Sequence, residues 1–194
     1  MKARTIVKGL TLGGAALAVG MWASTDEGRE RDAAAFRRVN GGEGPGADRF
    51  YGAITELGSW WAAGAAAGAL ALSGHRRAAA RALAAASVTW AAGQGLKKVF
   101  LRPRPYQADP QGTRLMIGRP RGTSWPSSHP AVLVTFLTVA GRELDLPAAA
   151  RGLLAALGNA VGVSRVYLGV HYPADVTGGV LLGRAVAELF SSGR

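Results

Sequence analysis

Residues 164–175 read SRVYLGVHYPAD, and they bring a guanidinium (Arg165), an imidazole (His171) and a carboxylate (Asp175) into one short segment. An aspartate four residues after a histidine can reach one ring nitrogen across a helical turn, which leaves the other nitrogen free to attack. The planar fork of Arg165 matches two phosphate oxygens at once. The segment therefore indicates a phosphate site beside a histidine nucleophile, although a His–Asp pair at this spacing is equally typical of a plain helix surface.

The composition describes a chain that can bury a core and that favours anionic partners. Of its 194 residues, 48% are hydrophobic and 18% are charged, which fits one folded domain and not a disordered chain. There is no cysteine, which excludes disulfides, thiolate metal sites and cysteine nucleophiles. The formal net charge of +11 favours nucleic acid, an anionic membrane or a phosphorylated substrate. Because the basic residues lie between long apolar runs, without a basic stripe and interleaved aromatics, we expect no nucleic-acid partner.

Six stretches of the chain lack Asp, Glu, Lys and Arg, and charged connectors separate them; they are 9–25, 57–75, 82–96, 122–141, 152–164 and 176–183. A membrane span needs about 20 residues, so the first two stretches are long enough and the later ones need flanking arginines that snorkel. Abundant Ala and Leu, without strand-like alternation, favour helices. We expect an all-α fold: a six-helix, membrane-embedded bundle with its active site in the extracytoplasmic loops and helix ends.

Two features bear on membrane embedding in opposite directions. Glycines four residues apart let membrane helices pack closely, and they occur as the pairs Gly9 and Gly13, Gly64 and Gly68, Gly158 and Gly162, and Gly179 and Gly183. Against embedding, Arg184 and Glu188 interrupt the last apolar stretch, where they would have to pair or face the bundle interior. A soluble helical bundle therefore stays open as the alternative.

The amino-terminal stretch resembles a signal anchor. Lys2, Arg4 and Lys8 flank an apolar run, and no convincing Ala-x-Ala cleavage site follows Trp22. We therefore expect residues 1–25 to form a retained anchor helix that belongs to the bundle. The remaining residues, 26–194, would then form the catalytic core of a single domain.

The positive flanks of the anchor predict the orientation of the chain. They hold the amino terminus in the cytoplasm, and alternating spans then place loops 97–128 and 165–175 outside a multi-pass cell-membrane protein. These outer loops are rich in arginine, against the positive-inside tendency. We expect their charges to bind phosphate. The run 40–46, with four glycines, is expected to be a flexible turn without a catalytic role.

A second group of functional residues runs from Lys97 to Arg104-Pro105, with Arg102-Pro103 inside it. Proline fixes its own backbone and biases its predecessor toward extended geometry, so both arginines are held in place. On its own, the group is also typical of a basic loop that attracts anionic headgroups.

A third group, WPSSHP at 125–130, comes directly before an apolar run. Pro130 suits the first turn of a helix, and Ser127 or Ser128 suits its cap. The free N–H groups and the positive end of such a helix form an anion site. Capping explains the serines but not His129.

The three groups, in this order, resemble the signature of the type 2 phosphatidic acid phosphatase superfamily. That signature reads Lys, six residues, Arg-Pro; then Pro-Ser-Gly-His; then Ser-Arg, five residues, His, three residues, Asp. The chain matches the first part at Lys97 to Arg104-Pro105 and the third at Ser164 to Asp175. It departs from the second part at Ser128, where the family has glycine. The matching region, 97–175, covers close to half of the chain.

The resemblance implies a metal-independent phosphohydrolase that uses no cofactor. His171 would attack phosphorus to form a phosphohistidine, Asp175 would hold its tautomer, and His129 would protonate the leaving oxygen and later activate water. The same division follows from in-line displacement, which needs a nucleophile on one side and a proton donor on the other. The phosphate oxygens would be held by Lys97, Arg104, Ser127, Arg165 and the backbone at Ser128.

The substrate expected from the resemblance is a membrane lipid phosphate or diphosphate: phosphatidate, phosphatidylglycerol phosphate, or a polyprenyl phosphate or diphosphate. The protein would contact membrane lipids, and the sequence assigns no oligomeric state. Two alternatives stay open: a soluble acid phosphatase or vanadate-dependent haloperoxidase on the same scaffold, and a non-catalytic membrane protein that binds a lipid phosphate.

Several conspicuous residues are expected to lie outside the catalytic machinery. His75 is interpreted as a loop residue or headgroup contact, and the tryptophans at 60, 61 and 90 as interfacial or packing aromatics. Arg114, Arg119 and Arg121 are interpreted as a solvated basic loop. Their place beside the third group raises the hypothesis that they bind a second phosphate or a headgroup.

Overall fold

The computed structural model describes residues 3–42 and 44–190, which form an all-helical fold without a β-strand in these ranges. They contain nine α-helices and one 3₁₀ helix: α1 (Ala3–Trp22), α2 (Asp26–Asn40), α3 (Pro45–Thr55), η1 (Glu56–Gly58), α4 (Trp60–Leu72), α5 (Arg76–Phe100), α6 (Pro105–Ala108), α7 (Ser128–Glu143), α8 (Ala148–Tyr167) and α9 (Pro173–Leu189). The prediction of an all-α fold is confirmed. Residues 1–2, which belong to the expected anchor, and residues 191–194 lie outside the described part of the chain.

The helix count differs from the six that the apolar stretches predict. Each of the six stretches falls mainly within one helix, namely α1, α4, α5, α7, α8 or α9. The additional helices are more polar or shorter. The cap of α2 illustrates how such a helix begins, because Thr25 Oγ1 accepts a hydrogen bond from Gly28 N at 3.0 Å and Asp26 and Glu27 occupy the first turn. A count of uncharged runs does not register helices of this kind.

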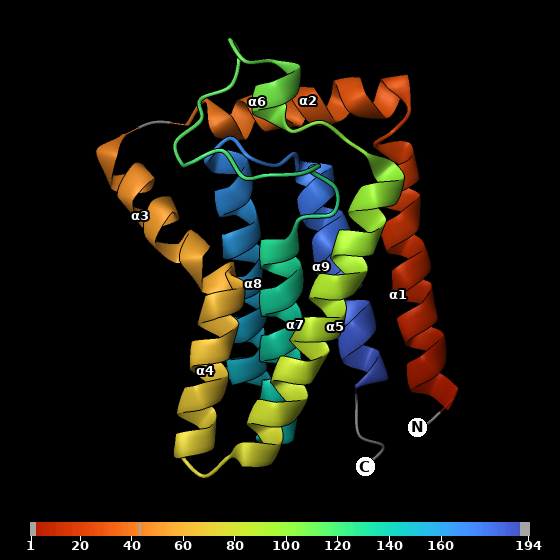
Figure 1. Cartoon of the computed structure of the whole chain (residues 1–194), viewed down its shortest axis with the longest axis vertical. Coiled ribbons are helices and arrows are strands. Elements are labelled where there is room, and N and C mark those ends of the chain that lie inside the picture. Colours follow the sequence, from red (N-terminus) through yellow and green to blue (C-terminus); the bar gives the residue numbers. More distant parts are fainter. Residues whose placement is uncertain (1–2, 43, 191–194) are drawn as a thin grey trace.

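The long helices lie side by side, and both described ends of the chain lie at the same end of the bundle (Figure 1). Helix α9 packs against α1 and α7, and α7 also packs against α5 and α8. Helix α2 lies across the opposite end of the bundle, together with α6. The connections α5–α7 and α8–α9 therefore meet under α2, which brings the three sequence groups to one end of the molecule.

The core between α4, α5, α7 and α9 consists mainly of small side chains. Eight of its eleven buried members are alanine, which lets helix backbones approach closely; the members are Ala63, Ala67, Ala79, Ala82, Ala85, Ala86, Val132, Phe136, Val139, Ala140 and Ala187. Two buried threonines satisfy each other here, since Thr89 Oγ1 and Thr135 Oγ1 are 2.8 Å apart. Thr135 Oγ1 also lies 3.0 Å from the carbonyl oxygen of Gly183, which ties α7 to α9.

The glycine pairs predicted from sequence divide into two kinds. A Cβ atom added at Gly179 would lie 2.4 Å from the carbonyl oxygen of Ser127, and one added at Gly183 would lie 2.5 Å from that of Ala131. The pair in α8 likewise meets side chains of α7 and α9 at 2.5–2.6 Å. In contrast, a Cβ at Gly64 or Gly68 would meet nothing within 4 Å. Glycine is thus required where α7, α8 and α9 cross, and the close packing expected at the α4 pair is wrong.

We expect Gly179→Ala to destabilise the bundle and Gly68→Ala to leave it as stable or slightly more stable. The first substitution forces the backbone of α7 away, at a cost of about 1–3 kcal/mol, whereas the second only improves helix propensity. Thermal unfolding of both variants in the same detergent measures the difference. Equal melting temperatures would show that α9 does not approach residue 127 as closely as described.

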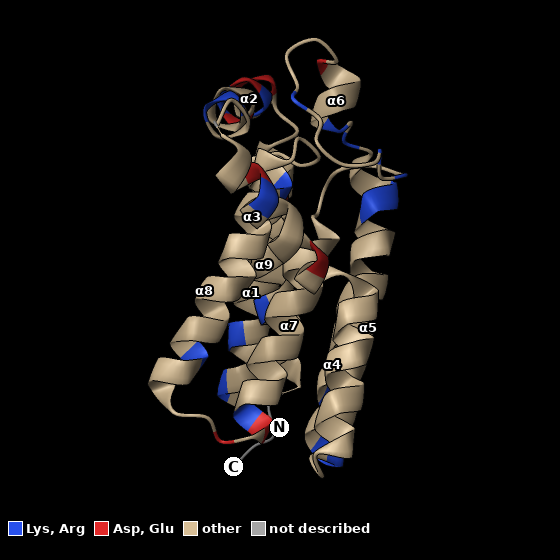
Figure 2. Cartoon of the chain, turned by 90° about the vertical axis from the view of Figure 1, so that its left-hand side faces the viewer, with Lys and Arg blue, Asp and Glu red and all other residues tan. Residues whose placement is uncertain are grey.

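By length and composition, one described helix, α1, is apolar enough to cross a membrane, and α4 is a shorter apolar helix. Figure 2 shows that α4 and much of α5 carry no charged residue along the middle of the bundle, while charges gather toward its ends.

Candidate active site

The three sequence groups converge at the end of the bundle covered by α2. Each residue lies in or beside a helix terminus: Lys97 in the last turns of α5, Arg104 directly before α6, Ser127, Ser128 and His129 at the start of α7, Arg165 near the end of α8, His171 between α8 and α9, and Asp175 in the first turn of α9. Lys97, Arg104 and Arg165 all lie close enough to His129 to interact with it electrostatically. The arrangement therefore places two histidines among three cations.

His171 is held between a carboxylate and a guanidinium. Its Nδ1 lies 3.4 Å from Asp175 Oδ2, and its Nε2 lies 3.1 Å from Arg104 Nη1. Burial lowers the pKa of the His171 imidazole well below its usual value, although the hydrogen bond to Asp175 works in the opposite direction. His171 is therefore neutral near pH 7. With Nδ1–H directed at Asp175, the Nε2 lone pair is the one available for attack.

The Asp175 carboxylate is itself fixed from several sides. Its Oδ2 accepts a hydrogen bond from Tyr172 N at 2.8 Å, in the capping position of α9. Its Oδ1 accepts from Arg102 Nη1 at 2.7 Å, and the side chain is fully buried. The guanidinium of Arg102 stacks over the Tyr172 ring, 4.3 Å from its centroid. The predicted placement of Asp175 beside His171 is thus observed, with additional support behind it.

A second buried carboxylate, Asp32 of α2, completes this support and was missed from the sequence. Arg102 Nη2 donates to Asp32 Oδ2 at 2.8 Å, and Asp32 Oδ1 accepts from Ala174 N at 3.0 Å. The structure shows why it is buried, because the buried residues of α2 recur every four positions, at 28, 32, 36 and 40. Asp32 therefore shares the inward face of α2 with Phe36, where a lone carboxylate requires a cationic partner.

We expect Asp32→Asn to lower both stability and turnover, while Asp26→Asn on the same helix leaves both nearly unchanged. Asp32 is a positioning residue: its loss leaves Arg102 with one anionic partner in a buried site, which costs about 2 kcal/mol or more. Asp26 is a control because its side chain is 99% exposed and its ion pair with Arg29 lies at the surface.

The measurements are thermal unfolding and the pH profile of kcat for the two variants. Loss of stability with an unchanged kcat profile would limit Asp32 to a structural role. Unchanged behaviour of Asp32→Asn in both measurements would remove it from the support of His171.

The two cations from the second sequence group hold the connection before α7. Arg104 donates from Nε to Gly122 O and from Nη1 to Val170 O, both at 3.0 Å, and it is buried. Lys97 Nζ donates to Thr123 O at 2.8 Å and to Ser124 O at 3.1 Å. These carbonyl contacts fix both side chains beside the histidines.

Several buried polar atoms at the site have no hydrogen-bond partner among the described residues, notably Ser127 Oγ and Arg165 Nε. Ser127 occupies the cap position of α7, as predicted, but its side chain makes no capping bond. Arg165 is anchored through Nη1, which donates to Thr55 Oγ1 at 2.7 Å. Unpaired donors beside the amino terminus of a helix and three cations are the features of an anion site.

The two remaining residues of the third group differ in their surroundings. Ser128, which replaces the family glycine, directs its Oγ toward Gln94 Nε2 of α5 at 3.4 Å. His129 is half-buried and packs against η1, where a Cβ on Gly58 would come within 2.8 Å of the His129 Cβ. No local sequence pattern predicts η1 and Thr55 as neighbours of the site, because they lie far away along the chain.

Arg114 lies in a structural network, and a second phosphate contact by this residue stays a hypothesis. Its Nη1 pairs with Asp48 at 3.1 Å, and its guanidinium stacks 4.9 Å from the centroid of the Tyr167 ring. Asn40 joins the same network by donating to the carbonyl oxygens of Arg114 and Tyr167. The expected flexible turn therefore starts at a well-held residue, and α3 already begins at Pro45.

Within residues 3–42 and 44–190, no cluster of three or more His, Cys, Asp or Glu side chains is suited to hold a metal ion.

The fold and the site together define a helical phosphatase scaffold. The chain matches the model of the PAP2 superfamily over residues 77–193, and it belongs to that family. It is 34% identical over 132 residues to the decaprenylphosphoryl-5-phosphoribose phosphatase of Mycobacterium tuberculosis strain H37Rv, covering 68% of this chain and 70% of the relative. The enzyme of the same name from Mycolicibacterium smegmatis is 35% identical over 119 residues, covering 61% of this chain and 62% of the relative.

Two solved structures share the fold. Aquifex aeolicus LpxE aligns with a TM-score of 0.73 at 24% identity, covering 80% of this chain and 91% of that chain. A transmembrane PAP2-type phosphatidylglycerolphosphate phosphatase from Bacillus subtilis aligns with a TM-score of 0.74 at 22% identity, covering 94% of both chains. At these identities the likeness concerns the architecture.

Proposed function

We propose that this protein is an integral membrane lipid phosphatase that hydrolyses a lipid phosphate without a metal ion, through a phosphohistidine on His171. The observation that carries the proposal is the state of His171: a buried, neutral imidazole with Nδ1 held by Asp175 and Nε2 facing a cluster of cations. Family membership and the phosphatase relatives support the same reaction.

The chemistry proceeds in two displacements. His171 Nε2 attacks phosphorus, the bond to the lipid oxygen breaks, and His129 gives its proton to that oxygen. His129 then takes a proton from water, which attacks the phosphohistidine and releases inorganic phosphate, so that both histidines return to their initial state. Throughout, the charge on the phosphoryl oxygens is stabilised by Lys97, Arg104, Arg165 and the start of α7.

Among the candidate substrates, we favour a polyprenyl-linked phosphate. The names of the mycobacterial relatives support this choice, since both act on a phosphoribose carried by a decaprenyl phosphate. Phosphatidate and phosphatidylglycerol phosphate are the competing substrates.

The proposed enzyme spans the cell membrane several times, with residues 1–25 as an anchor helix in the bundle, residues 26–194 as the phosphatase core, and the site on the outer face. Support comes from the packing of α1 along α9 and from large apolar side chains on the outer surface. Trp61, Leu72 and Leu153 are 83%, 92% and 73% exposed, which fits contact with lipid tails.

The test is release of inorganic phosphate from a panel of lipid phosphates in detergent with excess chelator. The proposal expects release, fastest from the polyprenyl-linked substrate. No release from any lipid would favour the non-catalytic alternative. Faster turnover of water-soluble phosphate esters, or halide oxidation with added vanadate, would favour the acid phosphatase or haloperoxidase alternative.

A further inference from the structure

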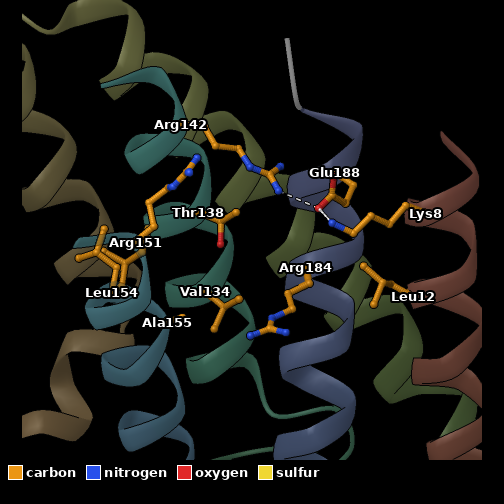
Figure 3. Close-up of a pocket in the computed structure, with 11 residues that line it drawn as sticks. Lys8, Leu12, Val134, Thr138, Arg142, Arg151, Leu154, Ala155, Arg184 and Glu188 are labelled. Carbon is orange, nitrogen blue, oxygen red and sulfur yellow. Dashed lines mark hydrogen bonds and ion pairs between the residues drawn. The ribbon is translucent and has the colours of Figure 1, made fainter. Parts of the chain in front are cut away.

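A second charged cavity lies at the end of the bundle opposite the candidate active site. It has a volume of about 310 Å³, is open to the surface and is lined by residues of α1, α7, α8 and α9 (Figure 3). Arg142 lines it from the last turn of α7, while Ser128 of the active site begins the same helix. The helical rise of 1.5 Å per residue puts about 21 Å between these two positions. The cavity is therefore separate from the phosphate site.

The cavity contains more positive charge than its one carboxylate can balance. Glu188 accepts from Lys8 Nζ at 2.8 Å and from Arg142 Nη2 at 2.7 Å. Arg151 and Arg184 also line the cavity, and neither forms a side-chain hydrogen bond or ion pair with any residue that the structure describes. The sequence predicts that Arg184 and Glu188 pair or face the bundle interior. Glu188 does face the interior, where it pairs with Lys8 and Arg142, whereas Arg184 is exposed and does not pair with Glu188. Two guanidinium groups remain available for an anion.

Apart from Thr138, the rest of the lining is apolar. Leu12 of α1, Val134 of α7 and Leu154 of α8 form walls beside the arginines, as Figure 3 shows. A ligand that satisfies both kinds of surface has an anionic head and an apolar chain.

We propose that this cavity binds the phosphodiester headgroup of an anionic phospholipid, with Arg151 and Arg184 turning toward the phosphate from the two ends of the cavity to which Figure 3 shows them pointing, and an acyl chain along the apolar wall. Guanidinium forks match phosphate geometry, and basic pockets between helices at the cytoplasmic side of a membrane suit anionic headgroups. The volume is at the small end for ligand pockets, which fits a headgroup better than a whole lipid. The assignment rests on the proposed membrane location but not on the phosphatase reaction.

The test measures lipid binding to the purified full-length protein in detergent, by native mass spectrometry and by the lipid-dependent shift in melting temperature. The probes are phosphatidylglycerol, phosphatidylcholine and inorganic phosphate. Arg151→Gln and Arg184→Gln remove one charge each from the cavity. Arg76→Gln is the matched control, because it removes an exposed charge at the start of α5, outside the cavity.

We expect phosphatidylglycerol to bind the native protein and Arg76→Gln equally, and to bind each cavity variant at least about tenfold more weakly. Equal binding of phosphatidylcholine, or equal binding to the cavity variants and the control, would overturn the proposal. If inorganic phosphate raised the melting temperature as much as phosphatidylglycerol does, the cavity would be a site for free phosphate, and the lipid assignment would be overturned.

Carrying out the binding measurements in a His171→Ala background separates this proposal from the proposed function. If phosphatidylglycerol binds but the native enzyme releases no phosphate from any lipid, only the proposed phosphatase function is contradicted. If the native enzyme releases phosphate but does not bind phosphatidylglycerol more tightly than phosphatidylcholine, only the proposed lipid site is contradicted. Arg151→Gln and Arg184→Gln should retain native turnover in detergent, which also confirms that they fold.

Discussion

His171→Ala is expected to lower kcat for a lipid phosphate by at least about a hundredfold, because it removes the nitrogen that attacks phosphorus. The cations around the vacated position still bind the phosphate group, so KM should change much less than kcat. The measurement is steady-state phosphate release by purified native and variant protein in the same detergent.

The matched control is His75→Ala. His75 precedes α5 at the far end of the bundle and is exposed. We expect native turnover from this variant. Turnover of His171→Ala within a few-fold of native would refute the assignment of the nucleophile, provided that both variants show native-like melting temperatures.

His129→Ala is expected to produce a loss of at least about a hundredfold on lipid substrates, but with a different dependence on the leaving group. A lipid alkoxide is a poor leaving group and needs the proton that His129 supplies. An aryl phosphate such as p-nitrophenyl phosphate leaves without that proton, so its first displacement should be largely preserved. The water step still needs a base, and the variant should therefore show a burst of nitrophenol followed by slow turnover.

Burst kinetics with the two substrates provide the measurement, and His171→Ala provides the comparison, since it should show no burst with either substrate. Equal losses on lipid and aryl phosphates, with no burst, would contradict the role of His129 as proton donor. This expectation rests on the half-buried position of His129 at the start of α7, beside Lys97, Arg104 and Arg165. Because burial and these cations favour the neutral imidazole, the proton that His129 donates has to arrive with the bound phosphate.

The sequence was sufficient to predict the residues that local spacing brings together. His171 and Asp175 lie one helical turn apart, and a helix cap at Ser127 or Ser128 follows from the prolines and the apolar run around them. The match to a family signature then joined these groups to Lys97, Arg104 and Arg165. The structure brings all of them to one end of the bundle.

The support behind the site could not be predicted in the same way. Asp32 contacts Arg102 across 70 positions, and Thr55 contacts Arg165 across 110, so neither pair leaves a local pattern. From the sequence, Arg114 is interpreted as part of a solvated basic loop, with a phosphate contact only as a further hypothesis. Its actual partner, Asp48, lies in a helix that uncharged runs do not reveal.

The helix count and the last apolar stretch show a second limit of sequence patterns. Helix α2 carries many charges, and its inward face becomes evident only when Asp32 and Phe36 are seen packed over the site. The i, i+4 spacing of Arg184 and Glu188 suggested a pair within α9. Lys8 and Arg142, from two other helices, satisfy Glu188 instead.

The central claim is that His171 carries the phosphoryl group, and rapid acid-free quenching of His129→Ala after mixing with a ³²P-labelled aryl phosphate tests it most directly. The account predicts label on the protein that is stable in base, labile in acid, and located on His171 by peptide mapping. Absence of protein-bound label during the nitrophenol burst, or label on any other residue, would contradict it.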